Sequence, residues 1–186
     1  MSETLDVVVI VGSLRKGSHT RRLANALAGV ASASMQLEIV PIAELPLYNE
    51  DLEAETPPAW RAFRERVARC HAVLFATPEY NRSVPGALKN AIDVGSRPFG
   101  KSVWDKKPAA IVSASPGAIG AFGANHHLRQ SLVFLNMPAL PQPEAYLGGA
   151  DKLFDADGRL TNESTRGFLT KFMQAFASWI ERNRQS

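Results

Sequence analysis

A run of small, polar and cationic residues near the start of the sequence has the composition of an anion-binding loop. It reads Gly12-Ser-Leu-Arg-Lys-Gly-Ser-His-Thr20, and it lies between an apolar, β-branched run and a helical pattern. The first backbone N–H groups of a helix have no partner within the helix, and they lie at the positive end of its dipole. Hydroxyl groups of Ser13, Ser18 and Thr20 and the guanidinium of Arg15 would add further donors. The loop therefore predicts a phosphate site.

The same loop also fits a plainer interpretation, in which Ser18 or Thr20 is an ordinary helix N-cap. That interpretation does not explain Arg15, because the N-terminal end of a helix favours an anion over a cation. Neither common glycine-rich nucleotide fingerprint occurs at this position. A triphosphate-loop string does occur at Gly95-Ser-Arg-Pro-Phe-Gly-Lys-Ser102, but it follows a helical pattern instead of a strand and contains Pro98. We expect a surface loop there.

Two further loops each follow a short, buried type of strand. They read Thr77-Pro-Glu-Tyr-Asn-Arg-Ser-Val-Pro-Gly86 and Ser113-Ala-Ser-Pro-Gly-Ala-Ile-Gly-Ala-Phe-Gly123. In a doubly wound sheet both would lie at the same edge as the first loop, and glycine lets backbone approach a flat ligand closely. The sequence therefore predicts a planar ring between them. Taken singly, the 77–86 loop is also explained by turn chemistry and the 113–123 loop by flexibility.

Side chains that could carry out catalysis by themselves are missing from the sequence. It holds no Gly-x-Ser-x-Gly elbow, and Cys70 precedes a strand without a catalytic context. His126 and His127 are adjacent on a helical pattern, so they cannot both face one metal ion. No metal site is predicted, and chemistry at the three loops would come from a bound cofactor.

Five apolar runs are expected to form the strands that position these loops. The four clearest are 7–11, 36–42, 72–76 and 109–114, and a weaker edge candidate lies at 139–142. Helical patterns alternate with the runs, and the clearest one follows a cap at Thr161 or Asn162. Strict alternation predicts an α/β fold of three layers, with a doubly wound, five-stranded parallel sheet forming a single domain over residues 1–186.

The composition of the chain excludes several other classes of protein. Its 186 residues include 21 Lys and Arg against 18 Asp and Glu, a net charge of +3 without a basic run that would bind nucleic acid. Its one cysteine, Cys70, cannot form a disulfide within the chain. Acidic residues precede the first apolar run, where a signal peptide carries cations, and no stretch approaches the roughly 20 apolar residues that span a bilayer. We expect a cytoplasmic protein that binds neither nucleic acid nor membranes.

Four strings of residues, spread over nearly the whole chain, are shared with a known family. They are Gly12-Ser-Leu-Arg-Lys-Gly-Ser18, Leu45-Pro-Leu-Tyr-Asn-Glu-Asp51, Thr77–Gly86 with Leu88-Lys-Asn-Ala-Ile-Asp93, and Leu128-Arg-Gln-Ser-Leu-Val-Phe134. In these strings the sequence resembles the NADPH-dependent FMN reductase family of flavodoxin-like proteins, and within it the chromate and quinone reductases. One departure is that family members often carry an aromatic residue and Asn where this chain has His19 and Thr20.

The resemblance implies an FMN-dependent NAD(P)H oxidoreductase without a catalytic side chain. Hydride would pass from NADPH or NADH through flavin N5 to a quinone, to chromate, to an azo compound or to a ferric chelate. The FMN phosphate would lie in the first loop and the isoalloxazine ring between the other two. The implied cofactor-binding residues are Ser13, Leu14, Arg15, Gly17, Ser18, His19, Thr20, Pro78, Glu79, Tyr80, Asn81, Ser115 and Gly117.

A homodimer or homotetramer is also implied, with the third and fourth helices buried between subunits. Two long loops, at 46–58 and 144–160, are compatible with contacts to a partner. Arg129, together with Glu144 and Tyr146, is a candidate for a contact between subunits. The alternative for Arg129 is a solvated helix residue.

Two other functions stay open on the sequence alone. A flavodoxin-type electron carrier would bind FMN but would not itself oxidise NAD(P)H, although such carriers are typically acidic and this chain is basic. A phosphate-ligand sensor without redox activity would not take up FMN at all.

Overall fold

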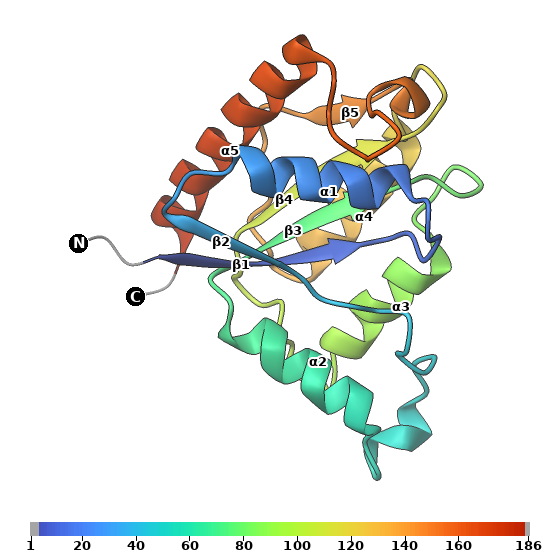
Figure 1. Ribbon diagram of the computed structural model, residues 1–186. Helices are drawn as coiled ribbons and strands as arrows, with labels where there is room; N and C mark the ends of the chain where they lie inside the picture. Colours follow the sequence, from blue (N-terminus) through green and yellow to red (C-terminus); the bar gives the residue numbers. More distant parts are fainter. Residues whose placement is uncertain (1–3, 185–186) are drawn as a thin grey trace.

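A five-stranded parallel sheet forms the centre of the computed structural model, which describes residues 4–184 (Figure 1). The strands are β1 (Leu5–Val11), β2 (Met35–Ile39), β3 (Ala72–Thr77), β4 (Ala109–Ala114) and β5 (Ala145–Leu147). The helices are α1 (His19–Val30), α2 (Pro58–Arg69), α3 (Gly86–Gly95), α4 (Phe122–Phe134) and α5 (Glu163–Asn183), with short 3-10 helices η1 (Glu50–Glu53) and η2 (Ala150–Lys152). The strand order β2-β1-β3-β4-β5 confirms the predicted doubly wound, flavodoxin-like fold.

Helices cover the sheet on both faces. Alternate residues of β1 contact opposite layers: Val7 and Val9 pack with α1 and α5, whereas Val8 and Ile10 pack with α2, α3 and α4. Figure 1 shows α1 and α5 above the sheet and α2 and α3 below it. Burial on both faces explains why the central strands are apolar without alternation, as parallel strands between two helical layers require.

The C-terminal helix α5 is the longest helix in the described part of the chain, at 21 residues. Asn162 caps it, because the Asn162 side chain accepts a hydrogen bond of 2.8 Å from the N–H of Thr165. This confirms the cap predicted at Thr161 or Asn162. Phe172 and Phe176 of α5 are buried against α1 and the sheet. Among residues 4–184, no helix has the length and apolar character needed to cross a membrane.

The fifth strand lies elsewhere than predicted. The candidate at 139–142 is wrong, since Ala139 makes only an isolated bridge to Ala109 and the strand forms at Ala145–Leu147 instead. Leu140 donates one hydrogen bond of 2.8 Å to the carbonyl of Ala109, but Pro141 has no N–H with which to continue the ladder. Proline likewise shortens β2, which ends at Ile39 rather than at residue 42 because Pro41 follows closely.

Candidate functional site

The loops after β1, β3 and β4 come together at the carboxyl edge of the sheet, where the strand arrows point in Figure 1. The chain reverses its direction of strand addition between β1 and β3, because β2 lies on one side of β1 and β3 on the other. Open α/β sheets bind their ligands outside the strand ends at such a switch point. The topology therefore confirms that the three loops predicted to form a site share one edge.

Gly12 begins the first loop in a position where a side chain would be tightly packed. A Cβ at Gly12 would lie 3.1 Å from Cδ2 of Leu88 and 3.3 Å from Cδ of Pro78. The N–H of Gly12 donates a hydrogen bond of 2.8 Å to the carbonyl of Ala76 in β3. The close approach brings the first loop directly against the start of the loop after β3.

The hydroxyl residues of the first loop are buried, while its central residues are exposed. Ser13, Ser18 and Thr20 are almost fully covered, whereas Arg15 is exposed. Ser18 is the N-cap of α1, because its Oγ accepts a hydrogen bond of 3.2 Å from the N–H of Arg21. The plainer interpretation is thus correct for Ser18 as an acceptor, but its hydroxyl hydrogen stays available as a donor.

Several donors at the start of α1 have no partner. The amide N–H groups of His19 and Thr20 have no hydrogen-bond acceptor among residues 4–184. The Nδ1 atom of the His19 ring is buried and likewise has no partner within this part of the chain. Buried polar atoms are normally paired, so an unpaired one beside free amides fits a site built for a hydrogen-bonding ligand. The positive end of the helix dipole favours an anionic one.

A tight turn shapes the loop after β3. Tyr80 and Ser83 exchange two backbone hydrogen bonds of 3.0 Å, and the two residues between them, Asn81 and Arg82, have φ values of 50° and 63°. Two consecutive left-handed residues are typical of a type I′ turn. The turn leaves the Tyr80 ring half-exposed. The Glu79 side chain is directed toward the beginning of α4 and contacts the N–H of Ala124.

The loop after β4 packs onto the next strand along the sheet. Ser115 donates its N–H to the carbonyl of Leu147 at 3.1 Å, and its hydroxyl donates to the carbonyl of Gly117 at 3.1 Å. Gly120 has φ +60°, and a Cβ there would lie only 2.5 Å from the carbonyl carbon of Tyr146. Glycine at this position therefore provides both a left-handed conformation and a close approach. Ser115 and Gly117 remain at the carboxyl edge, as predicted.

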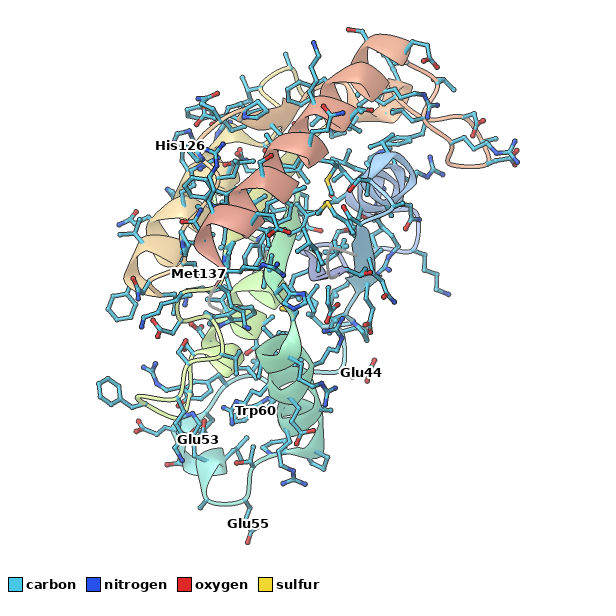
Figure 2. All side chains as sticks on the ribbon, turned by 90° about the vertical axis from the view of Figure 1, so that its left-hand side faces the viewer. Glu44, Glu53, Glu55, Trp60, His126 and Met137 are labelled. Atoms are coloured by element: carbon cyan, nitrogen blue, oxygen red, sulfur yellow. The ribbon has the colours of Figure 1, made fainter. Side chains whose placement is uncertain are left out.

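Sequence reasoning missed the residue that anchors the 45–48 segment. Asn90 of α3 is buried; its Oδ1 accepts the N–H of Tyr48 at 2.8 Å, and its Nδ2 donates to the carbonyls of Leu45 and Pro46. Trp60 of α2 stacks on Tyr48 and donates from Nε1 to Pro46. Figure 2 shows Trp60 at the α2 end of the molecule, well separated from His126 on α4. The Asn within the Leu88–Asp93 string was the available signal.

Arg129 makes its contacts within its own chain. Its Nε donates to Oδ1 of Asn125 at 3.1 Å, and its Nη1 donates to the carbonyl of Leu140 at 3.0 Å. Burial, followed by hydrogen bonding to Glu144, raises the pKa of Tyr146 to about 12. Arg129 is half-buried and links α4 to Leu140 within the chain, so it is not simply a solvated helix residue, and its contact with another subunit stays a prediction.

Comparisons with known proteins agree with this geometry. A family model described as NADPH-dependent FMN reductase matches residues 5–152. A quinone reductase from Pseudomonas putida is 62% identical over 185 residues, 99% of each chain. A 2-hydroxy-1,4-benzoquinone reductase from a Burkholderia species is 43% identical, with 97% of this chain and 98% of that protein covered. The chain belongs to the NADPH-dependent FMN reductase family.

One solved structure extends the agreement to the whole fold. The flavoenzyme FerB from Paracoccus denitrificans, an NAD(P)H:(acceptor) oxidoreductase, matches with a TM-score of 0.93 and 41% identity, over 98% of this chain and all of that one. As a member of the FMN reductase family, the protein is an enzyme with FMN as its cofactor and NAD(P)H as electron donor. This assignment favours the reductase over the electron carrier and the phosphate sensor.

The residues at the carboxyl edge fit FMN. Unpaired amides and the exposed guanidinium of Arg15 form a donor set suited to a phosphate group, and the buried Nδ1 of His19 joins it in the tautomer that has its proton on that atom. Within residues 4–184 no three His, Cys, Asp or Glu side chains are arranged to hold a metal ion.

Proposed function

We propose that this protein catalyses the reduction of quinones by NAD(P)H, with FMN bound at the carboxyl edge of the sheet. The observation that carries the proposal is the set of unpaired donors at the first turn of α1, directly at the switch point between β1 and β3. The acceptor class is supported by relatives of similar length that are named quinone reductases.

The first loop would hold the phosphate. The backbone amides of His19 and Thr20, which have no acceptor among residues 4–184, would donate to the anion, and the hydroxyls of Ser13, Ser18 and Thr20 can each donate one hydrogen bond. Arg15 adds a charge-assisted hydrogen bond from a side chain that the fold leaves exposed. The backbone N–H of Gly17 would add a further donor from the same loop.

The other two loops would enclose the ring. Pro78, Tyr80 and Asn81 lie on one side, and Ser115 and Gly117 on the other. The chemistry supplied by bound FMN is acceptance of a hydride from NAD(P)H and its donation to the acceptor. Backbone N–H groups of these loops would stabilise negative charge on a flavin held there. If one site holds both the nicotinamide ring and the flavin ring, the transfer between them no longer depends on a chance encounter in solution.

A site at an open sheet edge does not restrict the acceptor to one shape. We therefore include chromate, azo compounds and ferric chelates among the proposed acceptors, and the net charge of +3 favours the anionic ones. The whole chain, residues 1–186, would act as one domain. A single buried cysteine, Cys70, suits the reducing cytoplasm.

The proposed reaction predicts that NAD(P)H bleaches the FMN-loaded protein without any other protein present. Mixing the yellow protein with NADPH under anaerobic conditions should remove the flavin absorbance, and adding a quinone should restore it. A stopped-flow absorbance trace measures both steps. Free FMN at the same concentration is the control. Loaded protein that stays yellow with both NADPH and NADH would support the electron carrier instead.

We also propose that the protein is a homodimer or homotetramer that buries α3 and α4 between subunits. A groove of about 770 Å³ runs between these helices. Val133 and Phe134 beside it are 79% and 86% exposed. Neighbouring apolar side chains with this degree of exposure mark interaction surfaces.

Replacement of Phe134 by aspartate should therefore dissociate the assembly. The variant is expected to sediment with the mass of one 20.2 kDa chain, and the wild-type protein with a multiple of it. Ala28→Asp places the same charge at an exposed position of α1, on the opposite face of the sheet, and should leave the assembly intact. A wild-type protein that sediments as a monomer would contradict the proposal.

A further inference from the structure

The Glu79 carboxylate is largely buried and accepts two hydrogen bonds. Its side chain is 11% exposed. Oε2 accepts a hydrogen bond of 3.1 Å from the N–H of Ala124, and Oε1 accepts one of 3.2 Å from Nη1 of Arg82. The Arg82 side chain is largely exposed, so the contact with the helix is the better shielded of the two.

Helix α4 has no cap of its own to compete with this carboxylate. Its N-cap residue, Ala121, is left-handed and provides no side-chain hydrogen bond. Ala124 is the third residue of the helix, where a cap normally accepts the N–H. A carboxylate at the positive end of a helix is stabilising. Glu79 therefore caps a helix from a position 45 residues away in sequence.

Gly123 provides the space that this contact needs. A Cβ at Gly123 would lie 2.9 Å from Oε2 of Glu79 and 3.0 Å from the carbonyl oxygen of Arg82. The glycine is helical and has no positive φ, so conformational freedom does not explain it. A side chain there would displace the carboxylate from the helix.

A second contact joins the same loop to the same helix. Nδ1 of His127 and Oγ of Ser83 are hydrogen-bonded at 3.0 Å. His127 lies three positions after Ala124, and residues at this spacing share a helix face. The type I′ turn of residues 80–83 is thus held to α4 at both ends, by Glu79 before it and by Ser83 at its close.

We propose that Glu79 is a positioning residue, whose carboxylate fastens the loop after β3 to α4 and so sets its distance from the loop after β4. The inference rests on the proposed function, since these two loops are the ones assigned to the flavin ring. Along the chain they are separated by α3 and β4, and Glu79 joins the first loop to the start of α4, which directly follows the second. Its effect should reach the ring and leave the phosphate site unchanged.

Glu79→Ala and Gly123→Ala should therefore have the same consequence by different means. Each is expected to weaken the binding of riboflavin and of FMN by the same factor, about 10-fold, and to shift the visible spectrum of the bound flavin. Glu79→Gln keeps an oxygen that can accept the N–H of Ala124, so it should recover most of the affinity. Gly167→Ala is the control, because a Cβ at this α5 glycine meets nothing within 4 Å.

The double variant decides whether the two residues act through one contact. In Glu79→Ala/Gly123→Ala the added methyl group has no carboxylate to displace and meets only the carbonyl oxygen of Arg82, at 3.0 Å, so the combined loss should be smaller than the sum of the two single losses. Losses of flavin affinity that add up in the double variant would overturn the inference. So would a folded Glu79→Ala protein whose riboflavin affinity and flavin spectrum are unchanged. If Glu79→Ala does not fold, Gly123→Ala and Glu79→Gln give the same decision. A wild-type protein that binds no flavin would overturn the proposed function as well, and thus differs from either result.

Discussion

Replacement of Trp104 by alanine is expected to lower the free energy of unfolding by about 3–5 kcal/mol. The indole is fully buried, with ring centroids 5.9 Å from both Phe63 and Phe75. Its Nε1 donates a hydrogen bond of 2.9 Å to the carbonyl of Ile92. The substitution leaves a cavity between α2, α3 and the sheet and removes this hydrogen bond, and both effects favour unfolding.

Urea unfolding followed by far-ultraviolet circular dichroism measures the loss. Phe99→Ala is a suitable control, because Phe99 lies five positions earlier and is 92% exposed. An exposed aromatic side chain that contacts no core should change the free energy of unfolding by less than about 0.5 kcal/mol. A Trp104→Ala protein as stable as Phe99→Ala would contradict the assignment of Trp104 to the core.

The Trp104 indole also explains why glycine stands at position 95, the start of the triphosphate-loop string at residues 95–102. A Cβ at Gly95 would lie 2.5 Å from two carbon atoms of the Trp104 ring. The glycine thus closes α3 tightly against the indole, and the string follows a helix, as predicted. Packing accounts for Gly95 without any phosphate.

The fold could be predicted because its main determinants are local. Residues 7–11, 72–76 and 109–114 are short apolar runs, and burial between two helical layers follows from that pattern alone. β5 could not be found in this way, since its three residues, Ala145–Leu147, are too few to show a period. Its position depends on pairing with Val112–Ala114 of β4, which is a tertiary contact.

For the candidate site, the loops could be predicted and the side-chain directions could not. Topology alone brings the three loops to one edge of the sheet, as the sequence predicted. The contact of Glu79 with α4 depends on space left by Gly123, and the contacts of Asn90 depend on a loop more than 40 positions away. Nothing near these residues in the sequence specifies either partner.

Replacement of Arg15 by alanine is expected to weaken FMN binding by about 1.5–3 kcal/mol, which is a rise in Kd of about 10- to 150-fold. The guanidinium is exposed, lies in the loop that faces the unpaired amides of α1, and has no role in capping that helix. A hydrogen bond to a doubly charged phosphate is stronger than one between neutral groups. Titration of the apoprotein with FMN, followed by quenching of flavin fluorescence, gives the Kd.

Two controls, binding of riboflavin and the Lys16→Ala variant, distinguish a direct contact between Arg15 and the phosphate from the general electrostatic attraction of a cationic loop. Riboflavin has no phosphate, so its Kd should be the same for the wild-type protein and for Arg15→Ala. Lys16→Ala removes an equal charge from the neighbouring exposed position, and a purely electrostatic effect would weaken FMN binding equally in both variants. A loss confined to Arg15→Ala, and to FMN, is what a guanidinium directed at the phosphate requires. Equal losses in the two variants that vanish at high salt would instead mean that Arg15 acts only through long-range electrostatic attraction.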